Sequence, residues 1–164
     1  ESCSDLLTNF GGHVFAAGLT MKEENLDEFK RRFEQYVSSH ITDDQQRRTI
    51  MVDARLDFSD ITGELFSTIS KLEPFGPGNP VPQFVTYNAV NSRYSRRVGK
   101  NSEHLKLDLT DGTAIASGIA FGKGEMANHL LSGKAVDVCY KIEMNEYKNH
   151  SFLQLMVVDI RSGN

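Results

Sequence analysis

Two glycines followed by a histidine, Gly11-Gly12-His13, are the first residues whose types and spacing could do chemistry. Paired glycines expose backbone N–H groups and let a phosphate approach closely, and an adjacent histidine can donate a hydrogen bond to that phosphate. The small residues at 16–18 suit the same close approach. A glycine-based helix C-cap followed by a surface histidine would explain the same letters. The motif predicts a phosphate site and leaves a purely structural role open.

A basic segment at residues 93–106 is the second candidate site. It holds five cations and one acid, Glu103, in a chain whose net charge is −4. Cations that hold phosphates and an aromatic ring that stacks on a base are what single-strand binding requires. The candidate DNA-binding residues are Arg93, Tyr94, Arg96, Arg97, Lys100, His104 and Lys106.

The faces of this segment follow from strand geometry. Because side chains alternate along a strand, Arg93 and Arg97 should share one face, and Tyr94 and Arg96 the other. The ordinary alternative is the solvated face of an exposed strand pair, which is often charged. The concentration of cations in an otherwise acidic chain favours binding.

Other classes of site and of protein find little support. No cluster of Asp and His resembles a two-metal site, and there is no phosphate-loop or dinucleotide fingerprint. No apolar run approaches the ~20 residues that cross a bilayer, and the acidic, polar start does not resemble a signal peptide. Cys3 and Cys139 are too few for a disulfide scaffold and lack metal-ligand spacing, so we expect a cytoplasmic protein.

The charge distribution divides the chain in two. Residues 1–45 carry four basic and nine acidic side chains, and residues 46–164 carry fourteen basic and thirteen acidic ones. The polar stretch 42–46 reads as a linker, so we place a domain boundary between residues 45 and 46. The chain begins at Glu1 without a methionine, from which we expect a fragment or a processed product.

The first part predicts a helix, a glycine-rich turn, a strand and a second helix. The short helix is expected at 4–10 and the strand within 14–21. Asn25 is the expected N-cap of the second helix, with Glu28 completing a variant of the capping box. That helix carries an apolar stripe at helical spacing, formed by Leu26, Phe29, Phe33, Tyr36 and Val37.

The next segment predicts a strand at 49–58 and a helix capped by Asp60 and ended by Pro74. Helical spacing of apolar residues supports the helix, at Ile61, Leu65, Ile69 and Leu72. The following stretch is too rich in proline and glycine to be regular structure. Phe75 and Asn79 within it are either ligand contacts or parts of a structural elbow.

From residue 83 onward the pattern has a period of two. We expect strands at 84–90, 92–98, 103–109, 113–121, 136–144 and 152–160, a hairpin turn at Asp111-Gly112, a helix at 125–131, and a connection across 145–150. Several short antiparallel strands with one helix between the fourth and the fifth predict a small, partly open barrel. The oligonucleotide-binding barrel, or OB-fold, is the natural candidate, and the predicted class is α+β.

These motifs together resemble the RecJ family of single-stranded-DNA-specific exonucleases, in the DHH phosphoesterase superfamily. The long Pro/Gly motif is the most specific, whereas Gly-Gly-His is shared with other DHH phosphoesterases. The resemblance covers essentially the whole chain and rests on segments 10–13, 16–19, 26–33, 72–80, 97–100, 104–107 and 120–122.

The resemblance implies an enzyme that degrades single-stranded DNA from the 5′ end with Mn²⁺ or Mg²⁺, in DNA repair and recombination. The metal of such enzymes sits in an N-terminal DHH domain, which nothing here matches. Residues 1–45 would be the tail of a DHH-associated domain, and residues 46–164 an OB domain that grips DNA. Gly11, Gly12 and His13 would hold substrate phosphate near the metal centre.

The chain alone would then bind DNA without catalysis and without a metal of its own. Its implied partners are single-stranded DNA, the missing DHH domain of the same polypeptide and other repair proteins, with no membrane. One alternative is a non-enzymatic OB module that binds a protein or an oligosaccharide. Another is a DHH phosphoesterase that acts on short RNAs or nucleotides.

Overall fold

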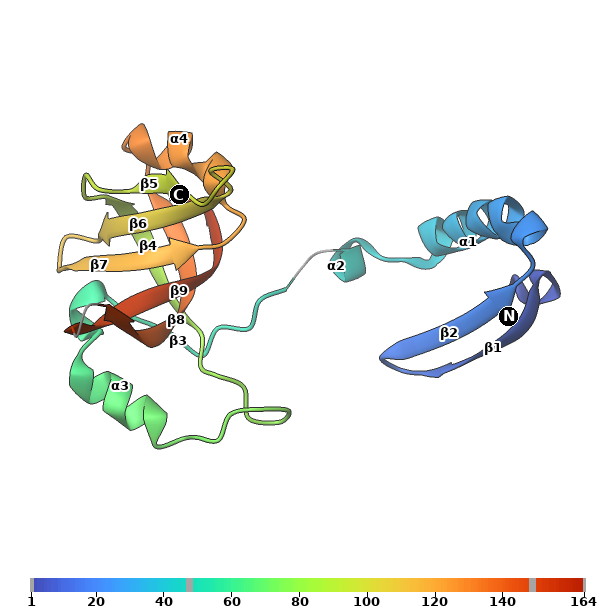
Figure 1. Cartoon of the computed structure of the whole chain (residues 1–164), viewed down its shortest axis with the longest axis horizontal. Coiled ribbons are helices and arrows are strands. Elements are labelled where there is room, and N and C mark those ends of the chain that lie inside the picture. Colours follow the sequence, from blue (N-terminus) through green and yellow to red (C-terminus); the bar gives the residue numbers. More distant parts are fainter. Residues whose placement is uncertain (1, 47–48, 148–149, 164) are drawn as a thin grey trace. The chain divides into compact units, whose positions relative to one another are not determined.

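The chain forms two compact units, Glu1–Ile50 and Met51–Asn164 (Figure 1). The computed structural model describes residues 2–46, 49–147 and 150–163.

The first unit is a two-stranded antiparallel hairpin with a helix. A 3₁₀ turn, Ser4–Leu6, leads into the hairpin. The regular elements are β1 (Leu7–His13), β2 (Ala16–Met21), α1 (Leu26–His40) and the short α2 (Asp43–Gln46). The expected amphipathic helix is confirmed as α1, with Phe29 and Phe33 stacked at 5.6 Å between ring centroids.

The helix expected at 4–10 is wrong beyond Leu6, because the chain enters β1 there. Glycine is required in this hairpin where β1 and β2 approach each other closely. Gly12 lies opposite Ala17, and a Cβ on Gly12 would meet the backbone oxygen of Ala16 at 2.6 Å. Gly11-Gly12-His13 therefore belongs to a strand and not to a helix end.

Asn25 is the N-cap residue of α1, as expected, but its side chain does not cap the helix. Its Nδ2 instead donates to the carbonyl oxygen of Leu6 at 3.1 Å. A second link joins α1 to the first turn, where both Arg32 Nη atoms donate to the Asp5 carboxylate at 2.8 Å. The hydrogen bond from Arg32 lowers the pKa of Asp5. Side-chain bonds thus attach the helix to the hairpin.

The second unit is a barrel with two helices. Its helices are α3 (Gly63–Ser70) and α4 (Ala127–Leu131), and its strands are β3 (Ala54–Arg55), β4 (Phe84–Asn91), β5 (Arg96–Val98), β6 (His104–Thr110), β7 (Ile115–Ala120), β8 (Val136–Tyr147) and β9 (His150–Ser162). The order is β3-β4-β8-β9-β7-β6-β5, and pairing of β4 with β6 closes the barrel. β7 and β9 pair in parallel and β8 and β9 antiparallel. The α+β class and the OB barrel are confirmed.

The barrel core explains the alternation along β6. Leu105, Leu107 and Leu109 are fully buried, while the residues between them face outward. Tyr140 is also buried, and its hydroxyl pairs with Thr86 Oγ1 at 2.8 Å. Burial raises the pKa of Tyr140 to about 12. Leu130 of α4 belongs to the same core, so this helix packs against the barrel.

The start of the barrel differs from the sequence-based expectation. Only Ala54–Arg55 of the strand expected at 49–58 pairs with a neighbour. Asp60 does not cap α3. The N-cap is Thr62, whose hydroxyl accepts the Leu65 N–H at 3.2 Å. Asp60 instead forms a capping box with Asp57 around a preceding 3₁₀ turn.

The Pro/Gly stretch behaves as a structural elbow. Asn79 Nδ2 donates to the carbonyl oxygens of Leu72 at 2.9 Å and of Pro74 at 3.0 Å. Phe75 is partly buried and packs against the barrel core. Both side chains that could have been ligand contacts are therefore engaged within the chain.

The strand expected at 92–98 is shortened to Arg96–Val98. Arg93 has φ = 122°, and Asn91 Oδ1 accepts the N–H groups of Arg93 and Ser95 at 3.3 Å. This turn breaks the alternation, so the face assigned to Arg93 and Tyr94 from strand geometry is wrong.

The remaining strands and the helix near 125–131 are confirmed with shifted ends. Gly112 has φ = 91°, as the hairpin turn at Asp111-Gly112 requires. The connection expected across 145–150 is shorter, because β8 ends at Tyr147 and β9 begins at His150. Positions 148–149 lie outside the described residues. No helix in the described part of the chain is long and apolar enough to cross a membrane.

Candidate nucleic-acid interface

A row of five side chains crosses the five paired strands from β5 to β8 on the outer face of the barrel. Each member lies opposite the next in the ladders, and residues opposite each other share a face. The row runs Arg96, Lys106, Ile119, Met156 and Lys141. It places two cations at one end, one at the other, and apolar side chains between them. We call it the cross-strand row.

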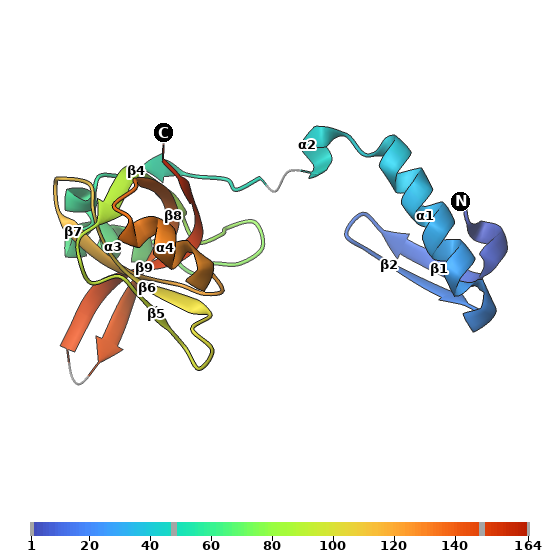
Figure 2. The ribbon, with the colours of Figure 1, turned by 90° about the horizontal axis from the view of Figure 1, so that it is seen from above.

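A groove of about 470 Å³ lies beside this row, between β6–β7 and the β8–β9 hairpin. Figure 2 shows the β5–β6 and β8–β9 hairpins extending from the same side of the barrel. OB barrels bind oligonucleotides on the face of their second and third strands, which correspond here to β6 and β7. The groove is lined by Val98, His104, Lys106, Gly118, Ile119, Phe121, Glu143, Met144, Asn145, Gln154 and Met156. We call it the barrel groove.

The turn between β5 and β6 uses the one acid of the basic segment. The Glu103 carboxylate accepts the N–H of Asn101 at 2.7 Å. Hydrogen bonds from its own N–H and from that of Asn101 lower the pKa of Glu103. Gly99, with φ = 94°, leaves room for this carboxylate, because a Cβ there would lie 2.7 Å from Glu103 Oε2. Glu103 thus stabilises the turn that carries Lys100.

His104 is engaged with the end of β7. Its Nδ1 accepts the N–H of Gly122 at 3.2 Å, and its Nε2 lies 3.7 Å from Glu103 Oε1. Its ring contacts that of Phe121 at 5.0 Å between centroids, with 79° between the planes. This contact links His104, the first residue of β6, to Phe121 at the rim of the barrel groove.

The predicted DNA-binding residues reach this face to different degrees. His104 and Lys106 line the barrel groove, and Arg96 lies directly opposite Lys106. Arg97 takes another direction, and its Nη2 lies 3.5 Å from Asn128 Oδ1 on α4. Lys100 lies exposed in the β5–β6 turn.

Arg93 and Tyr94 lie farther along the same sheet edge. Their loop is fixed beside Asp108, because the Asp108 N–H donates to Ser95 Oγ at 3.0 Å. Neither lines the barrel groove. Across the described residues, none of the five cations of the basic segment forms an ion pair.

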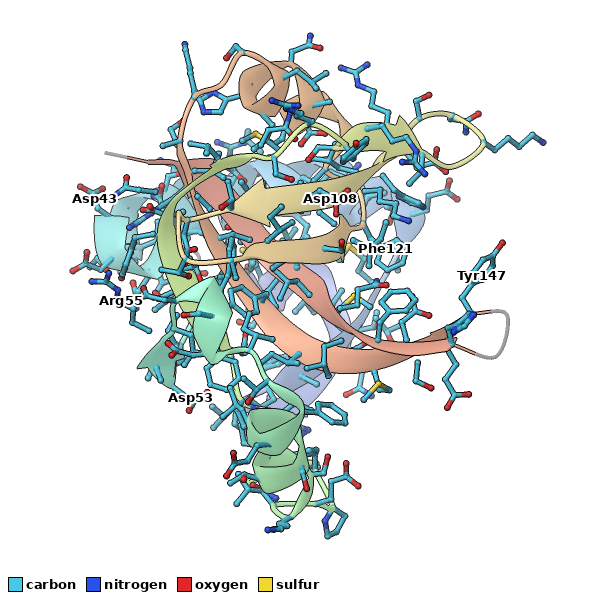
Figure 3. All side chains as sticks on the ribbon, turned by 90° about the vertical axis from the view of Figure 1, so that its left-hand side faces the viewer. Asp43, Asp53, Arg55, Asp108, Phe121 and Tyr147 are labelled. Atoms are coloured by element: carbon cyan, nitrogen blue, oxygen red, sulfur yellow. The ribbon has the colours of Figure 1, made fainter. Side chains whose placement is uncertain are left out.

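Sequence reasoning missed several residues of this face. Phe121 and Tyr147 are 58% and 63% exposed and point to the same side of the barrel (Figure 3). Asn145 Nδ2 donates to Gln154 Oε1 across the hairpin. Lys141 joins the face through a ladder with β9. The sequence signal for Phe121 was an aromatic residue directly after an apolar strand.

Gly11, Gly12 and His13 lie in the first unit, at the end of β1. His13 Nδ1 accepts the Phe15 N–H at 3.2 Å. The three residues line a groove of about 540 Å³ within that unit, shared with side chains of α1 such as Phe33. All three residues are exposed, and they pair with Gly18, Ala17 and Ala16 of β2.

Within the described ranges, no group of three or more His, Cys, Asp or Glu side chains is placed to hold a metal ion.

Comparison with known proteins identifies relatives along nearly the whole chain. The single-stranded-DNA-specific exonuclease RecJ of Bacillus subtilis is 31% identical over 159 residues, covering 97% of this chain and 20% of that protein. The Thermus thermophilus RecJ is 31% identical over 161 residues, covering 98% and 22%. The chain thus spans roughly a fifth to a quarter of the length of these relatives.

Comparison with solved structures agrees with the sequence relatives. The crystal structure of RecJ from Thermus thermophilus in complex with Mg²⁺ matches with a TM-score of 0.78 and 28% identity, covering 99% of this chain and 24% of that one. A structure of the same protein with Mn²⁺ matches equally well. The family model for the RecJ OB domain matches residues 52–159, which include every strand from β3 to β8 and most of β9. This chain belongs to the RecJ OB domain family.

Proposed function

We propose that this chain is the DNA-binding C-terminal portion of a metal-dependent 5′→3′ single-stranded-DNA exonuclease that acts in DNA repair and recombination in the cytoplasm. Residues 1–45 are the tail of a DHH-associated domain, and residues 46–164 are the OB domain. The names of the relatives support this proposal, together with the small share of their length that the chain spans.

The observation that carries the proposal is the pair formed by Arg96 and Lys106. They lie directly opposite each other on an exposed face, next to the barrel groove. Like charges in such a cross-strand pair cost roughly 0.2–1 kcal/mol. Neither has an ion-pair partner among the described residues that would relieve the repulsion. A phosphate backbone bound along β5–β6 supplies the missing negative charge.

The barrel groove gives a strand of DNA two unlike walls. The β5–β6 side is cationic, through Lys106 and the neighbouring Arg96. The hairpin side presents the amides of Asn145 and Gln154 and the carboxylate of Glu143, and Lys141 of β8 lies beside it on the same face. Phosphates are attracted to the first wall and repelled by the carboxylate of the second. The excess of cations on the β5–β6 side therefore favours binding with the phosphates toward β6.

In the complete enzyme, the first unit binds the substrate phosphate near the metal centre through Gly11, Gly12 and His13. Mn²⁺ or Mg²⁺ in the DHH domain supplies the hydrolytic chemistry there, and the two structures of Thermus thermophilus RecJ, one with each ion, support this metal use. The chain alone binds no metal and does not cleave DNA. Its other partners are the DHH domain of the same polypeptide and further repair proteins.

The alternative is an OB module that binds a protein or another ligand outside any enzyme. It predicts cations dispersed around the barrel in place of a cationic groove. The like-charge pair beside the groove favours DNA instead.

Fluorescence anisotropy of labelled oligo-dT at low and high salt tests the proposal. We expect binding at low salt that weakens as salt rises, through counterion release. No binding even at low salt would favour the alternative. A nuclease assay of the same clean protein with Mn²⁺ should show no turnover, and clear turnover would contradict the assignment of catalysis to the missing domain.

A further inference from the structure

We propose that Phe121 is the residue on which a base of the bound strand stacks, and that His104 is its positioning residue. The inference rests on the proposed DNA binding and assigns a role to two side chains within it. The aromatic residue expected from the basic segment, Tyr94, does not line the barrel groove and is not that platform.

Phe121 has the exposure and position that stacking requires. It follows the last residue of β7 at the rim of the groove, and 58% of it is exposed although the preceding Ala120 is fully buried. Figure 3 shows its side chain directed away from the barrel core. A large apolar ring open to water gains contact area when a base covers it.

His104 holds this ring in a defined orientation. It accepts the N–H of Gly122, the residue next to Phe121, and packs its own ring nearly perpendicular to that of Phe121. The edge contact with His104 leaves 58% of Phe121 exposed, which is enough for a base to reach the ring. Because the Nδ1 atom of His104 accepts the Gly122 N–H, it is not free to bind a phosphate.

The charges around Phe121 place a base there and a phosphate elsewhere. Lys106 lies opposite Ile119, and Phe121 follows two residues later, about 7 Å along the strand direction. Glu143 lines the other side of the groove and repels phosphates from it. A nucleotide whose phosphate contacts Lys106 can thus place its base on Phe121.

The test measures binding of an oligo-dT that contains one 2-aminopurine, whose fluorescence reports stacking, to the full chain. Phe121→Ala should weaken binding by about 5- to 100-fold, the usual effect of losing one stacked base. It should abolish the fluorescence change and leave the salt dependence unaltered, because every phosphate contact is retained. Phe121→Trp should retain both affinity and signal. Ile115→Ala is the matched control, since Ile115 is 67% exposed on the same strand and does not line the groove.

The role of His104 has its own readout. His104→Ala should reduce the 2-aminopurine signal without changing the salt dependence, and His104→Asn, which keeps an acceptor for the Gly122 N–H, should restore part of it. A change in salt dependence would instead make His104 a phosphate contact and overturn its positioning role.

Normal binding and an unchanged signal in Phe121→Ala would overturn the stacking role while leaving the proposed function intact. An absence of oligonucleotide binding by the unmodified chain would overturn both.

Discussion

Arg96 and Lys106 stand directly opposite each other across the β5–β6 ladder, two cations on one exposed face of the barrel. Within the described residues neither is paired with an acid. The arrangement lowers the stability of the free protein and suits an anionic ligand. Stability and affinity should therefore respond in opposite directions when these charges are removed.

Neutralising the pair should stabilise the protein. We expect Arg96→Gln with Lys106→Gln to raise the free energy of unfolding by roughly 0.2–1 kcal/mol, because the cross-strand repulsion disappears. Urea unfolding followed by circular dichroism measures this change. Lys71→Gln, at an exposed position just after α3, is the control and should have no effect. A loss of stability in the double variant would mean that the cations support the fold.

Gly118 should be intolerant of a side chain. A Cβ there would lie 2.9 Å from the Leu155 backbone oxygen, where β7 and β9 run in parallel. We expect Gly118→Ala to cost ~1–3 kcal/mol, because the strands must move apart. Gly63→Ala, in open space in the first turn of α3, should be neutral or slightly stabilising. Equal thermal stability of the two variants would contradict this packing.

Asp111 should make the barrel sensitive to acid. Burial raises its pKa, but hydrogen bonds from Phe58 N–H and from Thr113 outweigh this effect, so the pKa is lowered overall. The ionised carboxylate therefore adds stability that is present above the unfolded-state pKa of about 3.9 and is lost as pH falls through the folded-state value. Asp111→Asn should cost ~1 kcal/mol at pH 7, because its amide makes weaker bonds.

Urea unfolding at pH 7, 5 and 3 measures that pH dependence. The difference between wild type and Asp111→Asn should shrink at the lowest pH. A difference that stays constant from pH 7 to pH 3 would show that the charge of Asp111 contributes nothing.

His13→Ala should leave the oligo-dT affinity of this chain unchanged within about twofold. The reason is that His13 and the barrel groove lie in different units, and the proposed binding uses the second unit alone. In the complete enzyme the same substitution should reduce nuclease activity, because His13 no longer holds the phosphate near the metal. Anisotropy on the chain and a nuclease assay on the complete enzyme separate the two effects, and a large loss of affinity in the chain would place DNA on the first unit.

Local patterns were sufficient to predict most of the barrel strands. The alternation of leucines in β6 indicated which side chains are buried, and Asp111-Gly112 marked the hairpin turn. The apolar stripe of α1 was equally clear. These features depend on residues close together in the sequence, so one sequence is enough to predict them.

Features that depend on distant parts of the chain were not predictable. The parallel pairing of β7 with β9 places Met156 beside Ile119 and brings Lys141 onto the same face. The positive φ of Arg93 depends on a side-chain bond to Asn91 and removes Tyr94 from the expected strand. Periodicity cannot show either effect, so the groove and its aromatic rim required the structure.

The most direct test of the account is the salt dependence of oligo-dT binding by the unmodified chain and by the Arg96→Gln, Lys106→Gln double variant. The account predicts weaker binding by the variant and a plot of log affinity against log salt that is shallower by about 1.4, or ~0.7 for each phosphate that the variant no longer neutralises. The Lys71→Gln control should match the unmodified chain. Identical slopes and affinities for the double variant and the unmodified chain would contradict the claim that this pair binds the DNA backbone.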